Sequence, residues 1–213
     1  RSYVKLDGKL TYNKWCEGIR LGRNYTGDGR SHLMDFNVGG VAVGTRDSEV
    51  KLAEGGIVPV TLDVAALLDE QPIRSIRDRP YSQKPYWHIE RARIGDSREV
   101  TVELLLNGSP VEKKRVGADG DIEHLEFALK VDHSSWVAAR IFGSSHTNPI
   151  WVMVGDAPVR ASRRSAQWCL KSVDQCWSQK QRFIAPAEMP DALAAYAHAR
   201  EAYRKRLGES RFQ

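Results

Sequence analysis

The sequence lacks the residue spacings that most metal sites and common catalytic motifs require. No H-x-H, H-x-x-x-H or H-E-x-x-H spacing occurs, and no close cysteine pair supplies thiolates. No G-x-S-x-G elbow, P-loop or dinucleotide-binding fingerprint is present either. We therefore expect no metal, no cofactor and no complete catalytic site in this chain. Its six histidines are His32, His88, His124, His133, His146 and His198.

Cysteine and long apolar runs are also scarce. The three cysteines do not suggest a disulfide framework, because Cys169 and Cys176 share one predicted helix and lie about 10 Å apart along its axis. We read all three as small buried hydrophobes, which leaves the cellular compartment open. No apolar run approaches the roughly 20 residues that span a bilayer, so no membrane partner is expected.

Positive charge is concentrated in the last quarter of the chain. Residues 160–213 hold 11 Lys and Arg against 5 Asp and Glu, and they account for the whole net charge of +5. A nucleic-acid partner is not expected, because no aromatic platform accompanies these charges. Arg163 and Arg164 are candidate anion-binding residues at a helix start, and surface ion pairs are the alternative.

The middle of the chain reads as a series of short strands. Asn107-Gly108, between two apolar runs, is its strongest hairpin signal. Residues 66–85 interrupt the series as a long loop with room for one helical turn. The pattern predicts a mainly β fold, an immunoglobulin-like antiparallel β-sandwich with a leading helix and C-terminal helices. The expected strands are residues 33–38, 48–52, 57–64, 86–94, 100–106, 111–116, 122–131, 135–142 and 150–154.

Helical patterns flank these strands on both sides and divide the chain into three parts. Residues 1–30 hold a short strand and a helix over 11–21, and we interpret them as the remnant that closes a preceding catalytic domain. Residues 31–158 form the sandwich. Residues 159–213 form a helical extension, with one helix over 162–179 and a second that ends before Gly208. The stripe that docks the first of these helices is Cys169, Val173, Cys176 and Trp177.

Two polar clusters supply the candidate substrate-binding residues. Arg30 and His32 follow the leading helix, and His146 and Asn148 lie between the last two expected strands. Such loops offer hydrogen-bond donors and a proton carrier near neutral pH. Turn formation is the alternative for both clusters, because Asp28-Gly29 and Asn148-Pro149 are common turn sequences.

Several of these segments resemble one enzyme family. Residues 18–25 and 28–33 are similar to the end of the catalytic domain in PHP-type metallohydrolases of the CehA/McbA branch. The last strands of the sandwich in that family resemble residues 136–140 and 146–152. A helical extension in its longer bacterial members resembles residues 160–166 and 174–177. The resemblance implies a bacterial protein, and export from the cell is compatible with it.

The resemblance also implies a non-catalytic role for the chain itself. The family's metal ligands lie in H-x-H and D-x-H patterns that have no counterpart here, so the divalent metal is expected in the missing N-terminal catalytic domain. That domain would be the chain's partner, with the sandwich packed on it or walling its cleft. The alternative is a free-standing module that binds a carbohydrate, another small molecule or a protein, with Trp87 or Trp151 as its platform. Exposed aromatics in a row on one sheet face would favour this alternative.

Overall fold

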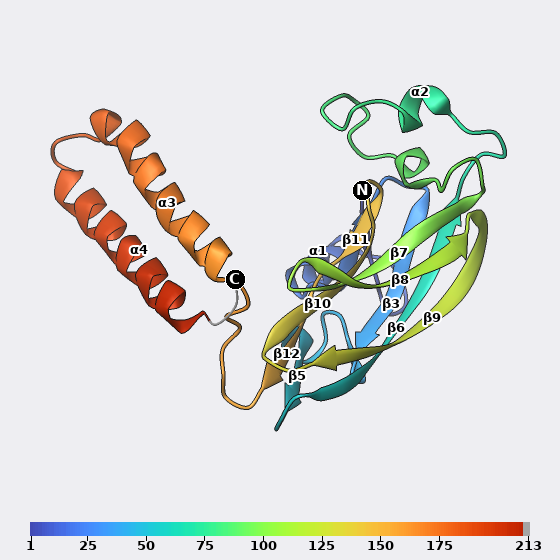
Figure 1. The fold of residues 1–213 in the computed structure, drawn as a ribbon, viewed down its shortest axis with the longest axis horizontal. Helices are drawn as coiled ribbons and strands as arrows, with labels where there is room; N and C mark the ends of the chain where they lie inside the picture. Colours follow the sequence, from blue (N-terminus) through green and yellow to red (C-terminus); the bar gives the residue numbers. More distant parts are fainter. Residues whose placement is uncertain (211–213) are drawn as a thin grey trace. The chain divides into compact units, whose positions relative to one another are not determined.

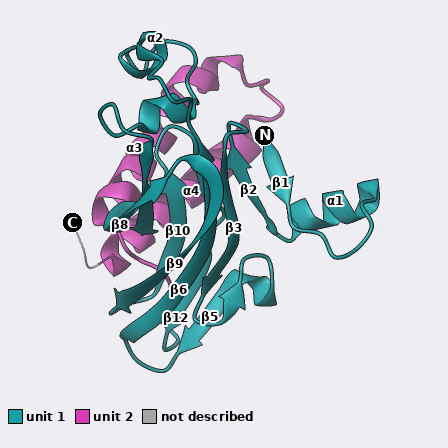
Figure 2. Cartoon of the chain, turned by 90° about the vertical axis from the view of Figure 1, so that its right-hand side faces the viewer, with its two compact units in different colours: residues 1–157 teal, residues 158–213 magenta. Residues whose placement is uncertain are grey.

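The chain divides into two compact units. The computed structural model describes residues 1–210, and unit 1 covers residues 1–157 while unit 2 begins at Pro158 (Figure 2). Unit 1 is built from two β-sheets, and unit 2 from two long helices (Figure 1). The fold is therefore mainly β with four α-helices in the described range, as the sequence predicts at this level.

Sheet A has eight strands and β10 at its centre. One edge of β10 pairs with β7, and its other edge pairs with β11 and then β12. All pairs are antiparallel except the one between β12 and β5. Its strands are β1 (Ser2–Val4), β2 (Asn24–Gly27), β5 (Glu49–Leu52), β7 (Glu99–Leu106), β8 (Ser109–Gly117), β10 (Ser135–Ile141), β11 (Ser145–Thr147) and β12 (Ile150–Val154).

Sheet B is a four-stranded antiparallel sheet that shares a hydrophobic core with sheet A. Its order is β4 (Val41–Ala42), β3 (Ser31–Val38), β6 (Gly56–Leu67) and β9 (Asp119–Val131). Alternate residues of β6, such as Val60 and Leu62, are buried in one core with residues of sheet A such as Val102 and Ile141. This period of two is the pattern that made the strands recognisable in the sequence.

Most of the expected strands are confirmed within a few residues. The Asn107-Gly108 turn is confirmed as well, since Leu106 pairs with Ser109 and both turn residues have positive φ. The polar stretches that form β2 and β11 were expected to be loops. They are strands because they pair with each other and extend sheet A, which their own composition does not reveal.

The segment between β6 and β7 corrects one strand prediction. Residues 86–94 form no strand but a bend that ends in a short 3₁₀ helix, Ile89–Ala92. Glu90 and Arg93 form an ion pair 2.7 Å long that is almost fully buried, and Arg93 also donates to the Asp69 and Ser97 carbonyls. These polar anchors hold the chain in an irregular path that its apolar pattern does not predict. The loop expected before it does contain one helical turn, α2 (Arg74–Arg77).

The N-terminal strand and helix belong to unit 1. Strand β1 pairs with β2, and α1 (Tyr12–Arg20) follows, with the Thr11 side chain accepting from the Lys14 N–H as its N-cap. Helix α1 projects beside β1 (Figure 2). The interpretation that residues 1–30 close a preceding catalytic domain stays a prediction.

Unit 2 is a helical hairpin. Helix α3 (Arg163–Lys180) and helix α4 (Met189–Glu209) contact each other through Trp177 and Tyr196, whose ring centroids lie 4.9 Å apart. The expectation that Gly208 ends the last helix is wrong. Helix α4 continues through it to Glu209, and the Ser210 hydroxyl then donates to the Arg206 carbonyl. The three cysteines are free, and each is half-buried.

Candidate functional site: the outer face of sheet A

Strand β10 separates the core from an aromatic outer face. Val137, Ala139 and Ile141 are fully buried in the core. Because successive side chains of a strand point to opposite faces, Trp136 and Arg140 lie on the outer face. Phe142 follows directly after the strand and is 52% exposed. From Trp136 to Phe142 this outer line is about 20 Å long at the usual rise per residue.

Neighbouring strands widen this line into a surface. Trp151 on β12 is the cross-strand partner of Trp136, so the two indoles share one face. At the other end of β10, a polar row crosses five strands on the same face. Its members, paired in order, are Lys113, Glu103, Arg140, His146 and Thr26.

Glu103 fixes the charged part of this row. Its carboxylate accepts from Arg140 at 2.7 Å and lies 2.9 Å from the Lys113 amine. Burial raises the pKa of this carboxyl, but hydrogen bonds and charges from Lys113 and Arg140 outweigh burial and leave its pKa below the usual value. The guanidinium of Arg140 also lies 4.8 Å from the centre of the Phe142 ring. Glu103 therefore holds Arg140 in place against Phe142.

Two more aromatic residues come from the segment before the 3₁₀ helix. Trp87 is 58% exposed, and its ring lies 6.1 Å from that of His146. Tyr81 packs edge-on against Phe142, with ring centroids 5.6 Å apart. The outer face thus combines exposed aromatics from the end of β10, from β12 and from this segment.

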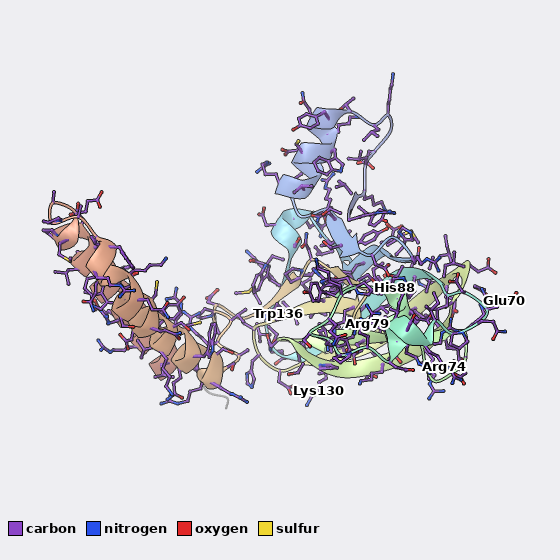
Figure 3. The ribbon with its side chains drawn as sticks, turned by 90° about the horizontal axis from the view of Figure 1, so that it is seen from above. Glu70, Arg74, Arg79, His88, Lys130 and Trp136 are labelled. Carbon is purple, nitrogen blue, oxygen red and sulfur yellow. The ribbon has the colours of Figure 1, made fainter. Side chains whose placement is uncertain are left out.

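Arg91 holds that segment in place. It is only 8% exposed, and its guanidinium donates to four backbone carbonyls at 2.8 to 3.2 Å, those of Arg79, Pro80, Gln83 and Pro85. The same group lies 5.0 Å from the centre of the Tyr81 ring. In Figure 3 the labelled Glu70, Arg74, Arg79 and His88 mark the course of the segment. Arg91 therefore holds the backbone of residues 79–85 and the ring of Tyr81 in position.

The structure places the predicted residues His146 and Asn148 in different surroundings. His146 is exposed on the outer face, where its Nδ1–H donates to the Thr147 carbonyl at 3.2 Å. Asn148 donates to the Gly22 carbonyl and to the Asn24 side chain, at 3.1 and 2.8 Å. Only His146 of this pair joins the aromatic surface, through Trp87.

The other predicted residues make contacts of their own within residues 1–210, none of them with the aromatic residues named above. Arg30 forms a half-exposed ion pair with Asp69 at 2.9 Å. His32 shares a hydrogen bond of 2.7 Å with the Tyr25 hydroxyl. In unit 2, Arg163 donates to the Leu207 carbonyl at 2.7 Å, and Arg164 is exposed on α3. A role in substrate or anion binding stays a prediction for these residues.

Sequence reasoning named Trp87, Trp151 and His146 but missed their neighbours. The sequence numbers of Trp136, Arg140 and Phe142 differ by even steps of four and two. Such a spacing indicates side chains on one face of a strand. Tyr81 and Glu103 carried no comparable signal, because ring contacts and cross-strand registers are set by the tertiary fold.

The described residues offer no resident metal centre. Within residues 1–210, no group of three or more His, Cys, Asp or Glu side chains is placed to hold a metal ion. No helix in the same range is long and apolar enough to cross a membrane.

No family model matches the chain, and no curated protein matches it.

Proposed function

We propose that unit 1 is a non-catalytic carbohydrate-binding module of immunoglobulin-like sandwich type. The observation that carries this proposal is the aromatic set on the outer face of sheet A, with Trp87, Trp151 and Phe142 exposed. Exposed aromatics gathered on one face mark binding surfaces more often than single exposed hydrophobics do. A saccharide offers C–H faces to such rings and hydroxyl groups to the polar row beside them.

The polar row suits an uncharged ligand. Within it, Glu103 lies between the cations of Lys113 and Arg140 and compensates one of their two positive charges, which leaves a net charge of only +1. His146 uses its Nδ1 on the Thr147 carbonyl, which leaves its Nε2 available to a ligand hydroxyl. A neutral polymer with many hydroxyl groups fits this arrangement better than a polyanion does.

The same geometry argues against catalysis on this face. Glycoside hydrolysis uses two carboxyl groups, one of them with a raised pKa. Glu103 is the carboxylate of the row, and its pKa is lowered because two cations hold it. The Glu103 carboxylate thus stays ionised and positions Arg140, and it does not act as a proton donor.

Affinity electrophoresis tests the proposal directly. We expect the protein to be retarded in native gels that contain one or more neutral polysaccharides from a panel of glucans, xylan and mannan. Replacing both Trp87 and Trp151 by Ala should abolish the retardation, since the sugar rings lose their stacking partners. Trp168→Ala is the matched control in unit 2. Retardation that survives the double replacement, or none on the whole panel, would reject the proposal.

A second proposal is that the chain is the accessory region of a PHP-type metal-dependent hydrolase. The apolar stripe of α1 supports it: Tyr12, Trp15 and Ile19 share one side of the helix and are 78%, 37% and 37% exposed. An amphipathic helix with this stripe uncovered is suited to pack on a further domain. The sequence resemblance supplies the identity of that domain.

The native protein tests this second proposal. Immunoblotting against unit 1 should detect a protein larger than 24.0 kDa, and the purified species should carry a divalent metal in stoichiometric amount. A native protein of the size of this chain, without metal, would contradict it. Neither outcome affects the carbohydrate test.

A further inference from the structure

A cleft of about 770 Å³ in unit 1 is lined mainly by residues of β1, β2, β3, β4 and β6. Its volume falls in the range of small-molecule sites. Tyr3 and Tyr25 stack in its lining, with centroids 5.1 Å apart. Leu33, Phe36 and Val43 contribute the apolar part of the lining. None of these residues belongs to the aromatic outer face of sheet A, so the cleft is a separate site.

Strained backbone surrounds this cleft. Strand β3 has a bulge between Met34 and Asn37, and within it Asp35 has φ of 51°, which is unfavourable for a residue other than glycine. Elsewhere along the rim, Gly44 has φ of 75° and approaches Arg23 closely. A Cβ atom added to Gly44 would lie 2.5 Å from the backbone nitrogen of Arg23. Conformations of this kind concentrate at ligand sites, where the surrounding fold maintains them.

The charged groups at the mouth of the cleft are already paired. Lys5 forms an ion pair with Asp35. Arg23 donates to the Gly44 carbonyl at 3.0 Å and lies 3.9 Å from Asp7. Burial raises the pKa of Tyr25 to about 12, so its phenol is neutral at physiological pH. The lining therefore presents no net charge to a ligand.

Neutral polar groups in the lining remain available. Asn37 and Thr61 are cross-strand partners on β3 and β6, and both line the part of the cleft on the side of sheet B that faces away from the core, because Val38 and Val60 next to them are buried. Among the side-chain hydrogen bonds of residues 1–210, none uses the Asn37 amide or the Thr61 hydroxyl. The Asn24 side-chain oxygen accepts from Asn148, which leaves its amide hydrogens for another acceptor.

We propose that this cleft binds an uncharged small molecule with an apolar body and a hydroxyl or amide group. The apolar part packs between the Tyr3–Tyr25 pair and the apolar lining, and the polar group bonds to Asn37 and Thr61. An ionised ligand would lose its hydration without gaining an unpaired countercharge. Asn148, one of the predicted site residues, acts indirectly by orienting Asn24.

Three small molecules of nearly the same shape but different charge test whether the cleft prefers an uncharged ligand. Biphenyl-4-carboxamide, biphenyl-4-carboxylate and biphenyl-4-carboxamidine carry charges of zero, minus one and plus one at neutral pH. Saturation-transfer NMR and a titration of the full chain should show saturable binding of the amide. The two charged probes should bind at least ten-fold more weakly.

Variants locate the binding site. Ala42→Phe fills the cleft and should remove amide binding, while Thr61→Val should weaken it about five-fold through one lost hydrogen bond, or about 1 kcal/mol. Trp87→Ala should leave it unchanged, which separates this site from the outer face. Equal binding of all three probes, no binding of the amide, or binding that both cleft variants leave intact would each overturn the proposal.

Discussion

Unit 1 and the hairpin of unit 2 differ in how much they bury. In unit 1, residues from both sheets, such as Val38, Val60 and Val102, are fully buried in one shared core. In the hairpin, only Ala166 and Ser210 are buried among residues 158–210, and Trp168 is 69% exposed. A unit with its own core can hold surface groups in fixed positions, which a binding site requires. This is why we place both proposed sites in unit 1.

Polar contacts supplement the small apolar interface of the hairpin. Arg160 pairs with Glu209 at 2.6 Å, and Arg200 pairs with Asp174 at 2.7 Å. The Cys176 sulfur lies 3.1 Å from the Tyr196 hydroxyl. Ion pairs that solvent still reaches contribute only about 0–1 kcal/mol each, so the hairpin should be the weaker unit.

The largest expected effect comes from the buried ion pair of unit 1. Glu90→Leu leaves the Arg93 guanidinium buried without its partner, and such a change costs about 3–5 kcal/mol. Denaturant unfolding should show this loss. The double variant Glu90→Leu/Arg93→Leu should recover part of it, and a single variant as stable as the parent would contradict the burial of the pair.

The same substitution in both units tests the comparison itself. Val60→Ala in the core of unit 1 should cost about 2 kcal/mol, because two buried methyl groups are lost and a cavity remains. Val173→Ala, at a half-buried position of α3, should cost less than about 1 kcal/mol because less apolar surface is lost. Hydrogen-exchange mass spectrometry resolves the two units. Equal losses of protection would show that the hairpin is packed as tightly as the sheets.

A smaller effect is expected at Glu103, with a defined pH dependence. Its pKa is lowered in the folded protein, so its stabilising contribution is present above the unfolded-state pKa of about 4.3 and is lost as the pH falls through the folded-state value. Glu103→Gln should therefore cost about 1 kcal/mol at pH 7 and close to nothing once the pH is below the folded-state pKa. A difference that persists unchanged in acid would show that the carboxylate charge does not contribute.

Trp168→Ala should have the smallest effect on stability. Its side chain is largely exposed on α3, so less than about 0.5 kcal/mol is at stake. Circular dichroism at a helix-sensitive wavelength during thermal unfolding measures the helices directly. A loss of several kcal/mol would mean that Trp168 packs against another surface, and the weak-hairpin account would fail.

Local pattern predicted the regular parts of this fold and missed the parts that depend on tertiary contacts. Alternation identified β6, β7 and β9, and helical spacing identified α3 and α4. The 3₁₀ turn at Ile89 escaped, because buried Glu90 and Arg93 override its strand-like composition. Part of the site could be predicted from the sequence. Trp87, Trp151 and His146 are recognisable as candidates by their residue types, but His146 and Trp151 share a face with β10 only because of the β10–β11 and β10–β12 registers.

The cleft shows the same limit in another form. Its rim depends on the bulge at Asp35, which arises in the pairing of β3 with β6, and on the close approach of Gly44 to Arg23. Both features bring together residues that are far apart in the sequence. In the sequence, Gly39-Gly40 is as turn-like as Gly44, and nothing local separates a tight turn from the wall of a site.

The six indole N–H signals provide the most direct test of the central claim, that the outer face of sheet A binds a saccharide. Each tryptophan reports on its own location: Trp87, Trp136 and Trp151 on the outer face, Trp15 on α1, and Trp168 and Trp177 in the hairpin. Oligosaccharides from a retarding polysaccharide should be titrated into ¹⁵N-labelled protein. The account predicts saturable shifts of the three outer-face signals while the other three stay in place. Shifts confined to Trp15, Trp168 or Trp177, or outer-face signals that never move, would contradict it.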